Sequence, residues 1–106
     1  MSGDDDILHI TTPGEWAAAR AAGAIRPPSL DTEGFVHCST RAQLDTTLAR
    51  HFRGAGPLLT LRLDADAIEA DLRWEESQPG ERFPHVYAPI PVSAVVDVDE
   101  VTPPSA

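Results

Sequence analysis

The feature that most constrains the fold is a strand-like stretch at residues 33–40, EGFVHCST. Strand side chains alternate between the two faces of a sheet, so one face is expected to carry Phe35, His37 and Ser39. Cys38 belongs to the opposite face and is expected in the core. A His and a Ser on one face of an apolar strand suggest a polar site. The alternative is a solvent-facing strand whose hydroxyl only caps a following helix.

The charge of the chain excludes several classes of function. Its 106 residues suit one domain, and its net charge is -9, with eight Arg and no Lys. This balance argues against non-specific nucleic-acid binding, and the absence of Lys excludes Schiff-base chemistry. No apolar run reaches the roughly 20 residues of a membrane span, and the start is acidic, unlike a secretory signal. We therefore expect a cytoplasmic protein without membrane contact, which fits a single cysteine.

The order of predicted elements indicates a small α+β fold. Residues 1–6 are expected to be a disordered acidic leader, residues 7–101 one globular domain, and residues 102–106 a loose tail. Two helices near the start are followed mostly by strands. The predicted helices cover residues 13–23 and 41–51, and the predicted strands cover residues 7–11, 33–40, 57–63, 73–75, 83–87 and 94–101.

Local signals define the ends of these elements. Thr12 and Glu15 form a capping-box pattern, and Trp16 on the same helix is expected to anchor the core. Two prolines in residues 24–30 predict an extended connector rather than a helix. Residues 64–72 read as one helical turn. Pro84 suggests that the strand at 83–87 lies at a sheet edge or begins there.

Three histidines, His9, His37 and His85, each lie in the middle of a separate apolar strand. If they converge, they could line a polar ligand cleft, because neutral imidazoles both donate and accept hydrogen bonds. They could instead hold zinc with an open fourth position, although no short His spacing supports a metal. His51, on a helix, has the position of an ordinary helix-end histidine. Glu75 is the best carboxylate for acid–base work, the alternative being a surface Glu beside Glu76.

Several motifs in order resemble those of one bacterial family. They include His9-Ile10-Thr11-Thr12, Gly34-Phe35-Val36-His37-Cys38-Ser39, Phe52-Arg53-Gly54, Leu72-Arg73-Trp74-Glu75 and Phe83-Pro84-His85-Val86-Tyr87. Over residues 7–100 the chain resembles domain-of-unknown-function family 952. That family is grouped with the ADP-ribosyltransferase-like superfold, and it resembles the RNA 2′-phosphotransferases in its Gly-Phe-Ile-His-x-Ser strand.

The resemblance implies two small packed sheets with a cleft for an NAD-type dinucleotide between them. It places His9 on the ribose and phosphate side and Ser39 near the nicotinamide ribose. The superfold normally supplies a late-strand Glu, but the corresponding strand here carries His85 and Tyr87, so Glu75 is the candidate substitute. We predict catalytic roles for Glu75 and His37. The predicted ligand-binding residues are His9, Thr11, Phe35, His37, Ser39, Arg53, Arg73, His85 and Tyr87.

Three functional hypotheses follow. The first is a transferase-like enzyme that binds a nucleotide, NAD or ADP-ribose-like ligand in the His-lined cleft. The second is a module that binds such a ligand without catalysis. The third is a metal-dependent hydrolase with three His ligands.

Overall fold

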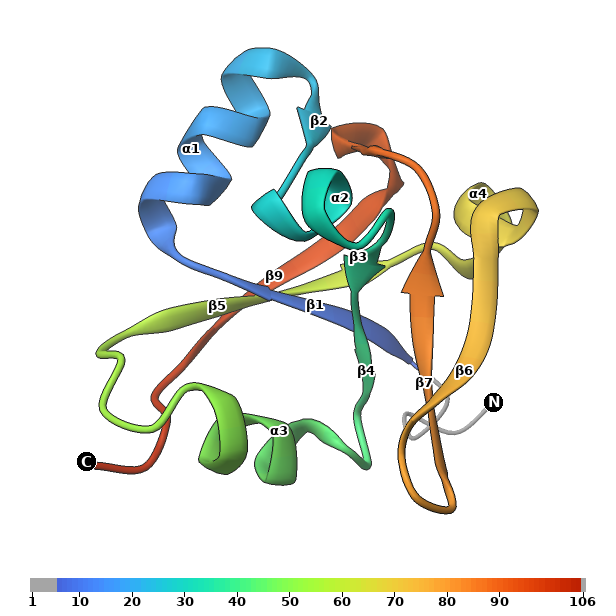
Figure 1. Cartoon of the computed structure of the whole chain (residues 1–106). Helices are drawn as coiled ribbons and strands as arrows, with labels where there is room; N and C mark the ends of the chain where they lie inside the picture. Colours follow the sequence, from blue (N-terminus) through green and yellow to red (C-terminus); the bar gives the residue numbers. More distant parts are fainter. Residues whose placement is uncertain (1–5, 106) are drawn as a thin grey trace.

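The computed structural model describes residues 6–105 and is an α+β fold of four helices, two 3₁₀ turns and several antiparallel sheets (Figure 1). The strands are β1 (Ile7–Thr11), β2 (Ala24–Ile25), β3 (Val36–His37), β4 (Ser39–Thr40), β5 (Leu58–Leu63), β6 (Leu72–Gln78), β7 (Glu81–Val86), β8 (Ile90–Pro91) and β9 (Val95–Val101). The helices are α1 (Pro13–Ala22), α2 (Pro28–Thr32), α3 (Leu44–His51) and α4 (Ala65–Ile68). The 3₁₀ turns are η2 (Glu69–Asp71) and η3 (Val92–Ala94).

The largest sheet has four strands in the order β4-β1-β5-β9. The partly continuous apolar run of β5 predicts an interior strand, and this is confirmed because β5 pairs with both β1 and β9. His9 lies opposite Leu61, and Leu8 lies opposite Ser39. Directly opposite residues share a face, so His9 and Ser39 project to opposite sides of this sheet.

A separate three-stranded sheet has the order β3-β7-β6, and a third sheet contains only β2 and β8. The expectation of two packed sheets is therefore too simple. Pro84 lies in the central strand of the three-stranded sheet, not at an edge or a strand start. Its carbonyl accepts a hydrogen bond from the Cys38 N–H at 3.1 Å. The backbone nitrogen of Pro84 points to the same side of the strand, where β3 has already ended at His37. The absence of an N–H at Pro84 therefore costs the sheet little stability.

The predicted central strand is broken at Cys38 into two short strands. β3 pairs with β7 in the three-stranded sheet, whereas β4 pairs with β1 in the four-stranded sheet. The chain thus passes from one sheet to the other within five residues, as the vertical segment β3–β4 in Figure 1 shows. Cys38 at the break is buried, as its strand position predicts.

The helices follow their local signals with two exceptions. α3 begins at Leu44 rather than at the predicted residue 41, because residues 41–43 form turns. Thr12 and Glu15 make the predicted capping box, and α1 ends at Gly23, whose φ of 89° lies in the left-handed region that favours glycine. The connector at 24–30 is not extended throughout, because α2 begins at Pro28. Proline is tolerated in the first turn of a helix, where its missing N–H has no intrahelical partner.

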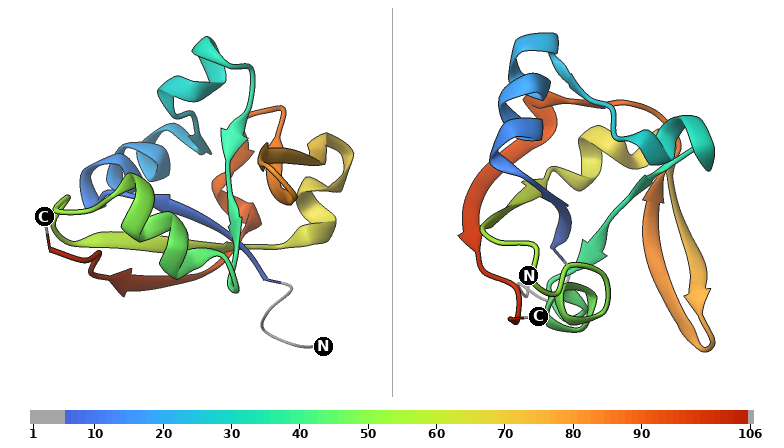
Figure 2. Two further views of the ribbon diagram at one scale, coloured as in Figure 1. Left: turned by 60° about the horizontal axis from the view of Figure 1, so that its bottom comes forward. Right: turned by 60° about the vertical axis from the view of Figure 1, so that its left-hand side comes forward.

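The core lies between the four-stranded sheet, α1 and the three-stranded sheet. Its buried side chains include Ile7, Ala19, Val36, Leu61 and Val86. The other face of the four-stranded sheet is covered by α3, which lies on the far side of β1 and β5 from α1 and α2 (Figure 2). Trp16, predicted in the core, is only partly buried and packs against the cluster from α1.

Both ends of the described chain are held by contacts. Asp6 forms an ion pair with Arg41 at 3.2 Å; the rest of the expected acidic leader lies outside the described residues. At the other end Pro103 is buried, and the Pro104 carbonyl accepts a hydrogen bond from the Gly54 N–H at 2.9 Å. Residues 102–105 are thus more firmly placed than a loose tail. None of the helices within residues 6–105 has the length and apolarity needed to cross a membrane.

Candidate functional site

One face of the three-stranded sheet gathers aromatic and ionisable side chains from three strands. His37 on β3 and Arg73 on β6 both lie opposite His85 on β7, so all three project from the same face. The Phe35 ring stacks on the His85 ring, with centroids 4.0 Å apart and planes inclined by 17°. His85 is 4% exposed, and the stacked Phe35 ring limits how it can turn.

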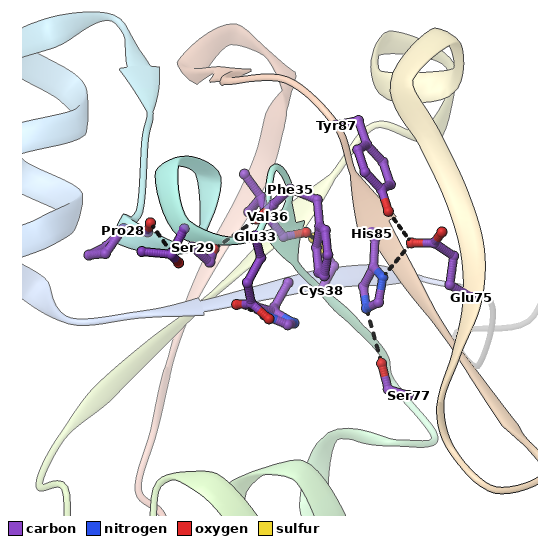
Figure 3. A network of polar contacts seen from close by, with 12 residues as sticks. Pro28, Ser29, Glu33, Phe35, Val36, Cys38, Glu75, Ser77, His85 and Tyr87 are labelled. Atoms are coloured by element: carbon purple, nitrogen blue, oxygen red, sulfur yellow. Dashed lines mark hydrogen bonds and ion pairs between the residues drawn. The ribbon is translucent and has the colours of Figure 1, made fainter.

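Glu75 is the centre of a hydrogen-bond network on this face, which Figure 3 shows. Its Oε1 accepts a hydrogen bond from His85 Nδ1 at 2.8 Å and one from the Tyr87 hydroxyl at 2.6 Å. On the other side of the ring, the Ser77 Oγ lies 3.2 Å from His85 Nε2. We call Glu75, Ser77, His85 and Tyr87 the Glu75 network. Glu75 is thus a partly exposed carboxylate, as a surface Glu would be, but it has two hydrogen-bond donors on this face.

These hydrogen bonds shift two pKa values in opposite directions. Donation from Tyr87, and then from His85, stabilises the carboxylate and lowers the pKa of Glu75. The same bond stabilises the neutral phenol and raises the pKa of Tyr87. At neutral pH the network therefore holds an ionised carboxylate that fixes a histidine ring.

His9 is buried on β1 below β3. Its Nδ1 lies 2.8 Å from the His37 carbonyl oxygen, which can only accept, so Nδ1 carries the proton. Burial lowers the pKa of His9, which keeps the ring neutral. In this tautomer Nε2 is a bare acceptor, and none of the hydrogen bonds among the described residues involves it.

A cleft of about 620 Å³ opens where the two larger sheets meet. All four histidines of the chain line it: His9, His37, His51 and His85. Phe35, Ser39 and Ser77 also face it, as do the carboxylates of Glu15 and Glu33. His37 Nε2 is paired with Glu33 Oε2 at 2.8 Å. No arginine is among the described residues that form its walls.

A second cavity of about 210 Å³ lies under α1. It shares His9, Glu15 and Pro27 with the cleft, so the two spaces adjoin. Its other walls are mainly apolar and include Trp16, but they also include the cationic Arg26.

Comparison with known proteins places the chain in a family. Residues 10–98 match the family model described as "Protein of unknown function (DUF952)". The chain belongs to the DUF952 family. It is similar to the crystal structure of protein CC0527 from Caulobacter crescentus, at 38% identity and a TM-score of 0.83, with 90% of this chain and 84% of that chain covered. A solution NMR structure of CC0527 gives 38% identity and a TM-score of 0.79, covering 92% and 84%. No match is found among curated proteins.

In this DUF952 protein the predicted site residues fall into two groups. The cleft brings together His9, Phe35, His37, Ser39 and His85. Ser39 reaches it on the α3 side, where its hydroxyl donates to Thr47 Oγ1 at 3.2 Å. Glu75 and Tyr87 are not in the cleft wall but lie behind His85, so Glu75 can act on a ligand there only through the imidazole.

The remaining predicted residues lie elsewhere. Thr11 faces the smaller cavity, where its hydroxyl lies 3.5 Å from Glu15 Oε1. Arg53 donates to the Ser105 carbonyl at 3.3 Å and is outside the cleft wall. Arg73 lies over the Tyr87 ring, 5.6 Å from its centroid. Neither of these guanidinium groups is placed to meet a phosphate in the cleft.

Three residues of the site were not predicted as such. Ser77 belongs to β6, which extends beyond the predicted strand at 73–75; its i, i+2 spacing from Glu75 is the signal that could have indicated a shared face. Glu33 precedes His37 by four residues. Its carboxylate reaches the His37 ring because the chain turns between the end of α2 and β3. His51 lies in the last turn of α3, as a helix-end histidine should, but it also borders the cleft.

The three-histidine metal site lacks the ligand arrangement that it requires. Within residues 6–105, no group of three or more His, Cys, Asp or Glu side chains is arranged to hold a metal ion. His37 Nε2 is paired with Glu33, and both ring nitrogens of His85 have hydrogen-bond partners, Glu75 and Ser77.

Proposed function

We propose that this DUF952 protein binds a nucleotide-like ligand of the NAD or ADP-ribose class in the His-lined cleft and transfers a group from it. The observation that carries the proposal is the cleft itself, whose volume of about 620 Å³ is in the range of small-molecule sites. Its walls combine aromatic rings with hydrogen-bonding imidazoles, and nucleosides offer matching planar bases and sugar hydroxyls.

The polar groups of the cleft suit a sugar better than a phosphate. His9 Nε2, as a neutral acceptor, can accept a hydrogen bond from a ribose hydroxyl. His37, whose side chain is 52% exposed, can present its ring to the ligand while Glu33 orients it. Ser39 adds a hydroxyl at the α3 end. We therefore place the nucleoside part of the ligand in the cleft.

The phosphates require a separate position, because Glu15, Glu33 and the net charge of -9 disfavour anions in the cleft. Arg26 is the cationic side chain in the adjoining cavity, which meets the cleft at His9. In this proposal a dinucleotide spans both spaces, with a phosphate directed toward Arg26.

The ADP-ribosyltransferase-like superfold is part of the same proposal. Two sheets that meet at a cleft support it, as does a carboxylate on β6 beside the strand that lacks the usual Glu. His85 would contact the reacting group, and Glu75 would position and polarise the imidazole. His37 is the second candidate for proton transfer.

Calorimetry with NAD and with ADP-ribose tests ligand binding. His9→Ala and His37→Ala are each expected to weaken binding by roughly 0.5–1.5 kcal/mol, the value of a hydrogen bond between neutral groups. Arg53→Ala, outside the cleft, serves as the control and should bind like the parent. Parent protein that binds neither ligand at millimolar concentration would contradict the proposal.

Product chromatography on the same ligands tests turnover. Glu75→Gln should lower the rate by about a hundredfold or more while leaving affinity nearly unchanged, because it removes the group that orients the base. Glu76→Gln, the neighbouring substitution on the opposite face of β6, should turn over at the parent rate. Equal rates for both variants would exclude a catalytic contribution from Glu75.

A non-catalytic binding module is the second candidate, favoured by the position of Glu75 behind the cleft wall. It predicts ligand binding with no product from the parent. In that case Glu75→Gln and the parent would be indistinguishable in both measurements.

A further inference from the structure

Ser77 occupies a position that the proposed function does not use. It lies near the end of β6, where the register with β7 shifts between Glu76 and Gln78, so it has no cross-strand partner. Bulges of this kind re-aim a side chain and are common next to active sites. Ser77 is exposed and its side chain reaches back toward His85 (Figure 3).

The hydrogen bonds around His85 have a direction. The Glu75 carboxylate accepts from Nδ1, so in the neutral ring Nε2 carries a lone pair. The Ser77 hydroxyl, 3.2 Å away, is the donor that this lone pair faces. A hydroxyl, an imidazole and a carboxylate in this order form the arrangement that activates a serine nucleophile.

The surroundings hold the imidazole in this orientation. Phe35 stacks on one face of the His85 ring, and Tyr87 donates to the same Glu75 oxygen that receives His85 Nδ1. The His85 ring is buried and contacts Phe35, Glu75 and Ser77, whereas an incidental Ser–His contact at the surface would need none of this support. The general base is thus preorganised before any substrate binds.

A substrate in the cleft can reach both Ser77 and His85. Ser77 and His85 both line the 620 Å³ cleft, whereas Glu75 and Tyr87 are not in its wall. A substrate in the cleft would therefore meet the hydroxyl and the base first and leave the carboxylate out of contact.

We propose that Ser77 is a catalytic nucleophile that forms a covalent acyl intermediate with carboxylic ester substrates, with His85 as general base and Glu75 as a positioning residue. The Ser77 oxygen bonds to the ester carbonyl carbon as its proton passes to His85 Nε2. The bond to the leaving alkoxide then breaks, and the alkoxide takes that proton from His85. Water then bonds to the acyl carbon as one of its protons passes to His85 Nε2. The bond between the acyl carbon and Ser77 Oγ breaks, the carboxylic acid leaves, and Ser77 Oγ takes the proton back from His85.

The charge of the cleft selects the substrate class. Glu15 and Glu33 line it, no arginine is among its described lining residues, and the chain has no lysine. A neutral ester is compatible with these walls, whereas an anionic phosphoryl group would be repelled. The inference does not depend on nucleotide binding, so calorimetry and serine labelling can succeed or fail separately.

A neutral alkyl fluorophosphonate, followed by peptide mass spectrometry, tests the nucleophile. We expect one adduct, on Ser77, and none on that peptide in Ser77→Ala. Ser93→Ala, in the exposed turn η3, is the matched control and should be labelled like the parent. Glu75→Gln should be labelled about a hundredfold more slowly than Glu76→Gln, because it loses the group that orients the base.

Three results would overturn the inference. They are folded parent protein that gains no adduct on Ser77, labelling of Ser77→Ala at the parent rate, and equal labelling rates for Glu75→Gln and Glu76→Gln. Hydrolysis of p-nitrophenyl acetate tests the substrate class. The parent should hydrolyse it at least about tenfold faster than Ser77→Ala, a small effect for the loss of a catalytic nucleophile. Equal rates would exclude an ester substrate.

Discussion

His9 is a residue whose burial makes stability depend on pH. Its pKa in the folded protein is lowered by burial, so below the usual histidine value of about 6.5 the unfolded chain binds more protons than the folded one. The free energy of unfolding should therefore fall as pH decreases from 7.5 to 5.5, with a slope from His9 of at most about 1.4 kcal/mol per pH unit. Urea unfolding at the two pH values measures this change.

His9→Gln should show a smaller pH dependence than the parent over the same interval, whatever its absolute stability. Ser93→Ala, at an exposed residue that does not titrate in this range, is the control and should keep the parental slope. If His9→Gln retains the full slope, another group must be responsible for it.

Cys38 illustrates how a sheet-to-sheet crossing protects a thiol. The residue is 5% exposed, and burial raises its pKa to about 12, so the reactive thiolate is rare at pH 8. We expect a disulfide reagent such as Ellman's to react with Cys38 only after urea unfolds the protein. Stoichiometric reaction within seconds in native buffer would show that the crossing opens readily.

At the scale of elements, the position of Trp16 sets the contribution of α1 to stability. Trp16 packs against the core but is only partly buried, with the Arg20 guanidinium 5.9 Å from its ring centroid. Trp16→Ala should therefore cost about 2 kcal/mol, less than the 3–5 kcal/mol of a fully buried aromatic. Trp74→Ala on the edge strand β6, 44% exposed, should cost less than about 1 kcal/mol. Denaturant unfolding that gives equal losses for the two variants would contradict this placement.

The elements also show what local sequence signals can predict. Capping residues located α1, apolar alternation located β1 and β9, and a partly continuous apolar run located β5, because these signals act within a few residues. The division of residues 33–40 at Cys38 was not predictable, since it depends on β7 and β1 competing as partners for one strand. The same limit applies to the site: alternation indicated His9, His37 and His85, whereas the role of Ser77 depends on the bulge in β6.

The whole molecule is organised by the junction of its two larger sheets. β3 and β4 connect them, and the cleft lies at this junction with the Glu75 network behind one wall. With a net charge of -9, long-range attraction cannot draw an anionic ligand to the molecule, so binding must rely on short-range contacts within the cleft. Added salt should accordingly not weaken ADP-ribose binding, because it screens the net repulsion, in contrast to proteins that use a basic surface.

An NMR titration of the ¹⁵N-labelled protein with ADP-ribose reports directly where the ligand lies. If the ligand occupies the His-lined cleft, backbone amides at residues 35–39, at Ser77 and His85, and next to His9 should show saturable shifts. Amides of α4 and of the outer strand β9, remote from the cleft wall, should not move. Saturable shifts confined to α4 or β9, or no shifts at millimolar ligand, would contradict the assignment of the His-lined cleft as the binding site.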